Sequence, residues 1–524
     1  MKKTLISFIL ILIFLSLNLL TGCINSIKIP IGNRPTKQFT IVDYVQDDAV
    51  FQAKSKLKIS GLSEEGVIIV ASLYDNKGDE VTQAYSNTNE NGIWNLEFDT
   101  PSASMKTYTL KIADSIGVYH HTFTEIKFGQ VWLMLGDEIK NQSVEDEGVE
   151  DNAGYNPTDY NRMFYYKNKW VAASEKISEF GYKLIEQMTI NFTNWNKYPI
   201  GIVFATSEET NIYSWLSRDI IESRKIIKDY LTNKGIYELD SDEPLNNLYD
   251  LTLKNLENMS YSNIIFNQGM KDIRDLNDGV CYNEHEFKNI YSLMIYSFIS
   301  SLDNNIEVID KFYIIQAASE FMDNVNILRN IQTGMSNYFN KCETIPTYDI
   351  TLLLNQDTGK YLSKDEYNLV KDTDKELNLK IVGVNFEKLV ERVYNFSVNK
   401  ESAPRLNDVV QEYGEDNQVK SIRLIFKNTK ELDEVDNIIG LEFIDENGEL
   451  IEVEYEIRDN EILVDLANIK VKNSNIEDDT NGDNLDTDKY VKIVEIRYGQ
   501  YNFIYDNNLS NGEVGVIPFE IIIK

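Results

Sequence analysis

The feature that most constrains the fold is a long segment, residues 128–395, in which short apolar runs alternate with longer amphipathic stretches. The apolar runs have the length of buried strands, and the amphipathic stretches have the period of covering helices. Such alternation is typical of a parallel sheet with helices on both faces. We therefore predict a three-layer α/β/α domain, with strands at 131–135, 200–205, 264–267 and 312–316 and helices at 171–188, 218–232, 246–259 and 287–303.

Two segments rich in short strands flank this domain. Residues 39–127 predict a β-sandwich, because apolar alternation recurs between turns at 76–79 and 89–92. Residues 396–524 return to strands and predict a second, sandwich-like β-domain. A chain of 524 residues is long enough for about three domains. The fold class is thus multidomain α/β plus β, and the expected sandwich strands lie at 50–52, 57–61, 67–73, 93–98, 108–112, 421–426, 440–444, 450–457, 462–466 and 491–498.

The first 22 residues are a targeting segment. Two lysines precede an apolar run over residues 5–20, and the sequence Leu20-Thr21-Gly22-Cys23 follows. This resembles a bacterial lipobox, in which the cysteine is acylated. An uncleaved membrane anchor is the alternative, but the run is short for a span of about 20 residues. We predict a lipoprotein signal peptide at 1–22, lipidation of Cys23 and a tether over 23–38, which hold an extracytoplasmic protein on the membrane of the cell envelope.

The charge of the chain excludes one class of partner. It has 51 basic and 84 acidic residues, a formal net charge of −33. A polyanion without a basic segment is repelled by nucleic acid, so we predict no nucleic-acid binding.

The sequence predicts neither a metal site nor a cofactor. His285 stands between Glu284 and Glu286, which is not the i, i+4 spacing of zinc ligands on a helix. Residues 477–488 have the length of a calcium loop, but they begin with Glu477 and predict a solvated acidic loop. No phosphate-binding glycine loop is present. Cys281 and Cys342 can form a disulfide or remain free and buried, and the sequence leaves both open.

One motif links the central domain to a known chemistry. Residues 129–140 read G-Q-V-W-L-M-L-G-D-E-I-K. This resembles the entry strand and nucleophile turn of the sialate O-acetylesterase family of SGNH hydrolases, G-E-V-W-L-C-S-G-Q-S-N-M. Glu138 occupies the position of the nucleophilic serine, while the strand half matches at Gly129, Val131, Trp132, Leu133 and Gly136.

The resemblance extends along residues 45–524. Residues 50–52 and 91–94 match landmarks of the family's N-terminal sandwich, and residues 495–499 and 516–519 match landmarks near its C-terminus. It implies an SGNH-type α/β/α domain at 128–395 between two β-domains.

The resemblance also implies where the catalytic parts should lie. An SGNH esterase needs a serine, a histidine base, an acid and donors for the oxyanion. In the second block, glycines of the family are replaced by Glu208 and Glu209, whereas scaffold residues remain at Thr210, Ile212, Trp215 and Ser217.

The remaining two blocks are also altered. The third keeps Gln268 and Gly269, and its polar tail is replaced by Met270 and Lys271; we expect Gln268 to be a packing residue. The block that should supply the histidine falls near residues 360–364 and contains none. The three histidines of the chain, expected at the surface, are His120, His121 and His285.

These observations lead to a main hypothesis and two alternatives. We predict no catalytic residue: the chain is an envelope lipoprotein with a degenerate acetylesterase scaffold, without esterase activity, that binds an acetylated glycan, another carbohydrate or an envelope protein. The first alternative is an active esterase that removes O-acetyl groups from sialic acid or other sugars, with Ser207 or Ser143 as the nucleophile and His285 as the base. The second is a purely structural spacer.

Overall fold

The structure is a computed structural model of the chain. It describes residues 29–140, 156–191, 198–237, 248–318, 323–356, 360–362, 379–400, 402–414, 419–435, 438, 440–470, 493–499, 510, 516 and 518–523. The predicted signal peptide and Cys23 lie outside these residues. The chain divides into two compact units, Met1–Phe128 and Gly129–Lys524. Within the described part, no helix has the length and apolar content needed to cross a membrane.

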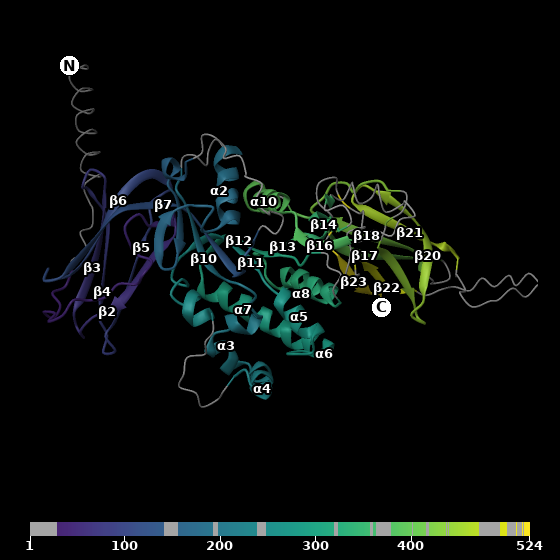
Figure 1. Ribbon diagram of the computed structural model, residues 1–524, viewed down its shortest axis with the longest axis horizontal. Helices are drawn as coiled ribbons and strands as arrows, with labels where there is room; N and C mark the ends of the chain where they lie inside the picture. The colour runs from purple at the N-terminus through teal and green to yellow at the C-terminus, as the bar shows by residue number, and fades with distance from the viewer. Residues whose placement is uncertain are drawn as a thin grey trace, which may run out of the picture. The chain divides into compact units, whose positions relative to one another are not determined.

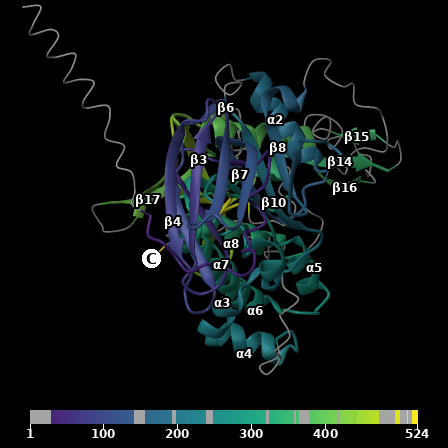
Figure 2. The same cartoon turned by 90° about the vertical axis from the view of Figure 1, so that its left-hand side faces the viewer.

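The first unit is built from antiparallel strands around an aromatic and aliphatic core. Strand β3 pairs with β4 and β6, β6 pairs with the first part of β7, and β2 pairs with β5; Figure 2 shows β3, β4 and β6 side by side. Every second residue of β5 is buried, and Trp94 is fully enclosed. The strands are β1 (Val50–Gln52), β2 (Lys56–Leu62), β3 (Ile68–Asp75), β4 (Glu80–Asn87), β5 (Ile93–Asp99), β6 (Ser104–Asp114) and β7 (His120–Asp137).

The second unit contains the expected parallel sheet. Its strand order is β13-β12-β11-β7-β10-β8-β9, and only the β8–β9 pair is antiparallel. Strand β7 lies in the middle: the next long strand, β10, lies on one side of it, and β11, β12 and β13 lie on the other. The bounds are β8 (Arg162–Tyr166), β9 (Lys169–Ala172), β10 (Ile200–Ser207), β11 (Tyr261–Asn267), β12 (Val308–Ile315) and β13 (Cys342–Ile345).

Helices cover both faces of this sheet (Figure 1). One face carries α2 (Glu179–Asn191) and α10 (Phe386–Tyr394), which share a core with Trp132 and Met134 of β7. The other face carries helices between β10 and β13: α3 (Arg218–Ser223), α4 (Lys225–Asn233), α5 (Met270–Asn277), α6 (Glu284–Glu286), α7 (Ser292–Asn305) and α8 (Val325–Tyr338). Short 3-10 or π turns occur at Pro157–Tyr160, Ile212–Trp215, Tyr249–Leu253, Phe287–Tyr291, Tyr348–Ile350 and Asn395–Asn399.

The predicted helices need three corrections. The helix expected at 171–188 begins only at Glu179, because Lys169–Ala172 forms strand β9. The helix expected at 218–232 is divided at Arg224 into α3 and α4. In place of a long helix at 246–259, the chain makes a π turn at Tyr249–Leu253.

The C-terminal part of the second unit is a seven-stranded antiparallel sheet of order β17-β18-β21-β20-β19-β22-β23. The rings of Phe426 on β18 and Phe519 on β23 lie 6.0 Å apart, so strands from opposite ends of the sheet share one core. A three-stranded sheet, β15-β14-β16, precedes it. The bounds are β14 (Thr351–Asn355), β15 (Lys360–Leu362), β16 (Leu379–Val384), β17 (Arg405–Tyr413), β18 (Val419–Lys427), β19 (Leu441–Asp445), β20 (Leu450–Arg458), β21 (Glu461–Lys470), β22 (Ile493–Tyr498) and β23 (Phe519–Ile522).

The predicted fold class, multidomain α/β plus β, is confirmed in its coarse form. The domain boundaries proposed from the sequence, at residues 22, 38, 127 and 395, stay predictions.

Helix α10 is attached to the segment after β13 by a nearly buried ion pair. Arg392 Nη1 donates to Asp349 Oδ1 at 2.5 Å, and Nη2 donates to Oδ2 at 2.9 Å. Nη1 also donates to the carbonyl of Pro346 at 2.9 Å. The bidentate geometry fixes the helix, and removal of one partner would leave a charge without compensation.

We predict that Arg392→Ala lowers the free energy of unfolding by about 3–5 kcal/mol, since Asp349 then stays buried without its cation. Lys388→Ala, on the exposed side of the same helix, should change it by less than about 0.5 kcal/mol. Denaturant unfolding measures both. Equal effects of the two substitutions would contradict the role given to the pair.

Candidate functional site

The candidate site lies where the central strands of the parallel sheet end. Strand β7 pairs with β10 on one side and with β11 on the other. The connection after β7 runs to the β10 side, and the connection after β10 crosses to the β11 side, so the two connections diverge at this point. Open α/β sheets bind ligands in the crevice beyond the carboxyl ends of such strands. The ends are in register: Gly136 pairs with Thr206 of β10 and with Asn267 of β11.

Gly136 allows the ends of β7 and β11 to approach each other. Its φ is +93°, and a Cβ atom there would lie 2.2 Å from the carbonyl oxygen of Asn267. The turn that follows is held from both sides: Asn267 Nδ2 donates to the carbonyl of Asp137 at 3.1 Å, and the Glu138 amide donates to the carbonyl of Ser207 at 3.3 Å. The turn therefore has one fixed geometry.

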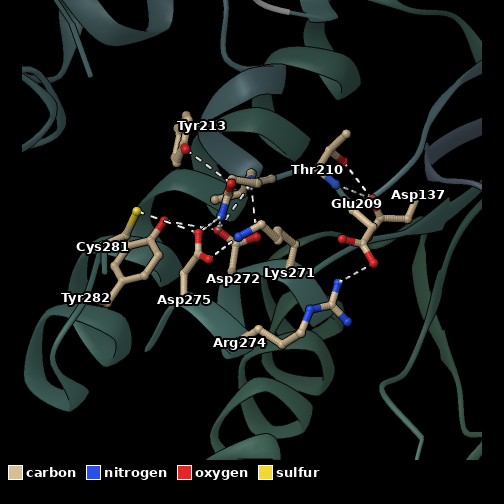
Figure 3. Close-up of polar contacts among 12 residues, drawn as sticks. Asp137, Glu209, Thr210, Tyr213, Lys271, Asp272, Arg274, Asp275, Cys281 and Tyr282 are labelled. Carbon is tan, nitrogen blue, oxygen red and sulfur yellow. Dashed lines mark hydrogen bonds and ion pairs between the residues drawn. The ribbon is translucent and has the colours of Figure 1, made fainter. Parts of the chain in front are cut away.

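Asp137 points toward the loop after β10 rather than into solvent (Figure 3). Its Oδ1 accepts hydrogen bonds from the amide and from the hydroxyl of Thr210, both at 2.7 Å. Burial raises the pKa of Asp137, and the two bonds from Thr210 oppose that rise. Trp215 Nε1 donates to the same hydroxyl at 3.0 Å. Asp137 and Thr210 thus join the end of β7 to the loop after β10.

Three acidic residues lie just after the ends of β7 and β10, and each has a basic neighbour. Glu138 Oε2 lies 3.8 Å from Lys140 Nζ, and Lys140 also pairs with Glu208. Glu209 Oε1 lies 3.4 Å from Arg274 Nη2. The side chains of Glu138, Glu208 and Glu209 are 35%, 67% and 72% exposed. Ion pairs this exposed stabilise a fold by about 1 kcal/mol or less.

A small cavity of about 20 Å³ lies beside Glu138, room for about one water-sized group. Apolar side chains form most of its wall, and polar groups stand among them. The lining residues are Met134, Leu135, Asp137, Glu138, Ile139, Ser178, Phe180, Phe204, Thr206, Ile265 and Asn267.

Gln268 is engaged inside the protein. Its side chain is nearly fully buried; Nε2 donates to the carbonyl of Thr210 and to Asp272 Oδ2, and Oε1 lies 3.0 Å from the Thr210 hydroxyl. Both donor hydrogens therefore have partners in the fold. This geometry is that of a packing residue.

No nucleophile–base pair occurs among the residues that the structure describes. His285 is exposed on α6, and its ring lies near Asn289. His120 and His121 belong to the first unit, where the His121 ring contacts Gln38. In this part of the chain no serine or cysteine is hydrogen-bonded to a histidine.

The other sequence candidates are placed as follows. Ser207 ends β10 and Lys360–Leu362 forms β15, while Ser143, residues 363–364 and the acidic loop 477–488 lie outside the described residues. Cys281 and Cys342 are free and buried, which decides between the two alternatives left open. No group of three or more potential metal ligands occurs in the described ranges.

Sequence reasoning missed the most buried polar group of the site. Asp272 is fully enclosed on α5 and accepts hydrogen bonds from Asn211, Ile212, Gln268 and Tyr282. Its position in the third block was visible, but nothing local distinguishes it from a solvated helix aspartate. Its burial depends on contacts with residues up to 61 positions away.

Comparison with known proteins gives a fold but no family. No protein-family model matches the chain, and no curated protein matches it in sequence. Among solved structures it resembles XAC1771, a carbohydrate acetylesterase from Xanthomonas citri. The identity is 16%, the alignment covers 92% of this chain and 99% of that chain, and the TM-score is 0.62. At this identity the likeness concerns the fold, which is therefore esterase-like.

Two further matches do not indicate a shared fold, because their TM-scores are low. The alpha-2-macroglobulin of E. coli matches 20% of this chain and 7% of its own, with 14% identity and a TM-score of 0.14. A beta-glucuronidase from Bifidobacterium dentium matches 59% and 60%, with 11% identity and a TM-score of 0.18.

We predict that Gly136→Ala lowers the free energy of unfolding by at least about 3 kcal/mol, because it combines an unfavourable φ with a clash against Asn267. Gly279→Ala is the matched control: Gly279 has a φ of +65° but nothing within 4 Å of a Cβ atom. It should cost only the backbone strain, about 1–2 kcal/mol. Denaturant unfolding would contradict this assignment if both variants lost the same stability.

Proposed function

We propose that this protein is an envelope lipoprotein, anchored through Cys23, that uses an acetylesterase-like scaffold to bind carbohydrate and does not hydrolyse esters. The observation that carries the proposal is Glu138, which stands at the turn where a sialate O-acetylesterase or other SGNH enzyme has its serine. It pairs with Lys140 and has no histidine partner in the described part of the chain.

The electrostatics of the crevice support the loss of activity. Acyl transfer develops negative charge on the carbonyl oxygen, and catalysis requires donors aimed at that charge. Here Glu138, Glu208 and Glu209 bring carboxylates to the mouth of the crevice. Removing one oxyanion donor typically lowers the rate by about 10²–10³-fold, and repulsion by carboxylates adds to that loss.

The missing base supports the same conclusion independently. A serine or a carboxylate at this turn still needs a group that takes up a proton, or a substrate reactive enough to dispense with one. A triad enzyme without its triad retains about 10³–10⁴-fold catalysis over water when its oxyanion donors are in place. The amide of Gln268, the donor that remains from the third block, is used by Thr210 and Asp272.

The same groups suit the binding of a polyhydroxylated ligand. Exposed carboxylates are strong acceptors for sugar hydroxyls, and three of them gather at the strand ends where α/β sheets bind ligands. The structural neighbour XAC1771 is by its title a carbohydrate acetylesterase, which supports a carbohydrate, acetylated or not, over an envelope protein as the ligand. Nucleic acid is disfavoured by the net charge of −33.

The first prediction concerns activity. The purified protein should hydrolyse 4-nitrophenyl acetate and O-acetylated sugars at the rate of buffer alone, and Glu138→Ala should not change that rate. Product release followed by absorbance, and acetate release for the sugars, measure this.

Turnover that disappears in Glu138→Ala would overturn the proposal. Turnover that survives in Glu138→Ala and disappears in Ser207→Ala or His285→Ala would instead establish the alternative, an active carbohydrate acetylesterase with relocated residues.

The second prediction concerns binding. On a glycan array the protein should retain a defined set of glycans, and the double variant Glu208→Gln, Glu209→Gln should bind them about tenfold more weakly, as expected for the loss of about 1.4 kcal/mol of charged hydrogen bonds. Glu284→Gln is the control. Glu284 is exposed, pairs with Lys288 and lies on α6 rather than in the loop after β10. The absence of any retained glycan would favour the purely structural spacer.

A further inference from the structure

Asp272 is a carboxylate that the fold surrounds with donors from three separate segments. It lies in the first turn of α5 and is fully buried. Oδ2 accepts from the amide of Ile212 at 3.0 Å and from Gln268 Nε2 at 3.3 Å, and Oδ1 accepts from Asn211 Nδ2 at 3.3 Å and from the Tyr282 hydroxyl at 3.1 Å. These partners follow β10, β11 and α5, so one side chain holds three loops together.

The carboxylate has no cation beside it in the described part of the chain. Lys271 pairs with Asp275, and Arg274 pairs with Glu209. A second acidic residue, Asp275, lies close to Asp272. Asn211 Nδ2 donates to Asp275 at 2.8 Å as well as to Asp272. Burial without a counter-charge disfavours the ionised form, and the hydrogen bonds favour it.

Among the titratable groups in this cluster, Asp272 is the one whose pKa lies near neutral pH. Burial raises its pKa to about 7, against the effect of its four hydrogen-bond partners. The neighbours include a lysine and an aspartate that neutralise each other, a thiol whose pKa is raised, and tyrosines whose pKa values are raised; they are Lys271, Asp275, Cys281, Tyr213, Tyr230, Tyr282 and Tyr291.

A proton on Asp272 conflicts with this set of partners. A protonated carboxyl must donate one hydrogen bond, yet the Asn211, Ile212 and Gln268 groups that face it are N–H donors, and neither amide side chain can accept there unless it rotates. The Tyr282 hydroxyl can reverse its role in place. Protonation therefore weakens the bonds to the segment 210–212, which belongs to the loop after β10, and to Gln268, which holds Thr210.

We propose that Asp272 is a proton-operated lock on residues 210–212, in the loop after β10. Ionised, it holds the segment 210–212 in the geometry described above. Protonated, in mildly acidic surroundings, it releases that segment and Gln268. The lock does not depend on the identity of the ligand or on the proposed lack of activity.

The lock and the contribution of Asp272 to stability should respond to pH in opposite directions. Because the pKa of Asp272 is higher in the folded chain than its ordinary value of 3.8, the folded state takes up the proton more readily than the unfolded state. The contribution of Asp272 to stability is thus present in acid and is lost as the pH rises through about 7. A segment 210–212 that loosens in acid while the stability contributed by Asp272 increases distinguishes the lock from simple acid unfolding.

Two buried reporters can test the lock in the whole protein. Ile212 donates its amide to Asp272, and Trp215 donates its indole N–H to Thr210. Between about pH 5 and pH 9, the methyl signal of Ile212 and the indole signal of Trp215 should shift with one common NMR midpoint near 7. Hydrogen exchange of the Ile212 amide, corrected for its intrinsic pH dependence, should become several-fold faster below that midpoint.

Three variants decide the assignment. Asp272→Asn should abolish the midpoint. Asp275→Asn should keep it and move it to lower pH, because a like charge is removed and Lys271 is released. Tyr282→Phe should move it to higher pH, because the ionised form loses a donor, and it serves if Asp272→Asn does not fold. Reporter shifts that are flat over this range, or a midpoint unchanged in Asp272→Asn or unmoved in Tyr282→Phe, would overturn the proposal.

Discussion

The crevice depends on the close approach of three parallel strand ends. Strand β7 is hydrogen-bonded along both edges, to β10 and to β11, and its central residues are buried on both faces. Parallel strands in this position need apolar residues on both sides, which Val131 to Leu135 supply. At the end of the strand, Gly136 removes the one side-chain carbon that would collide with β11. The positions of Asp137, Thr210 and Gln268 all follow from that contact.

Two kinds of carboxylate surround the crevice, and burial separates them. Glu138, Glu208 and Glu209 are partly or largely exposed and lie near Lys140 or Arg274. Asp272 is enclosed and relies on hydrogen bonds alone among the described residues. Desolvation raises the pKa of Asp272 more than the hydrogen bonds lower it, so the pKa is raised overall. The exposed carboxylates reach solvent, whereas the buried one is bonded to the loops that follow β10, β11 and α5.

The sequence predicted those elements whose own residues determine them. The strand expected at 131–135 falls within β7, and 200–205 lies within β10, because these apolar runs are short and contain β-branched or aromatic residues, which favours a strand over a helix. Strand β4 was missed because Glu80–Asn87 is largely polar and lies at the edge of its sheet. Strand β9 was read as part of a helix because four residues carry too little period to identify. Asp272 could not be recognised because its burial depends on Asn211, Gln268 and Tyr282, which come from three loops.

The difference between retained and altered motif residues also has a physical cause. Ile212 and Trp215 are fully buried, and Thr210 and Gln268 nearly so, each with contacts that the fold requires. Glu138, Glu208 and Glu209 have side chains that reach solvent, so the identity of these residues matters little to the core packing. The buried residues that carry the resemblance serve the packing of this fold and do not by themselves indicate ester cleavage. For this reason a shared fold with an acetylesterase says little about catalysis, and the exposed positions of the crevice must decide the chemistry.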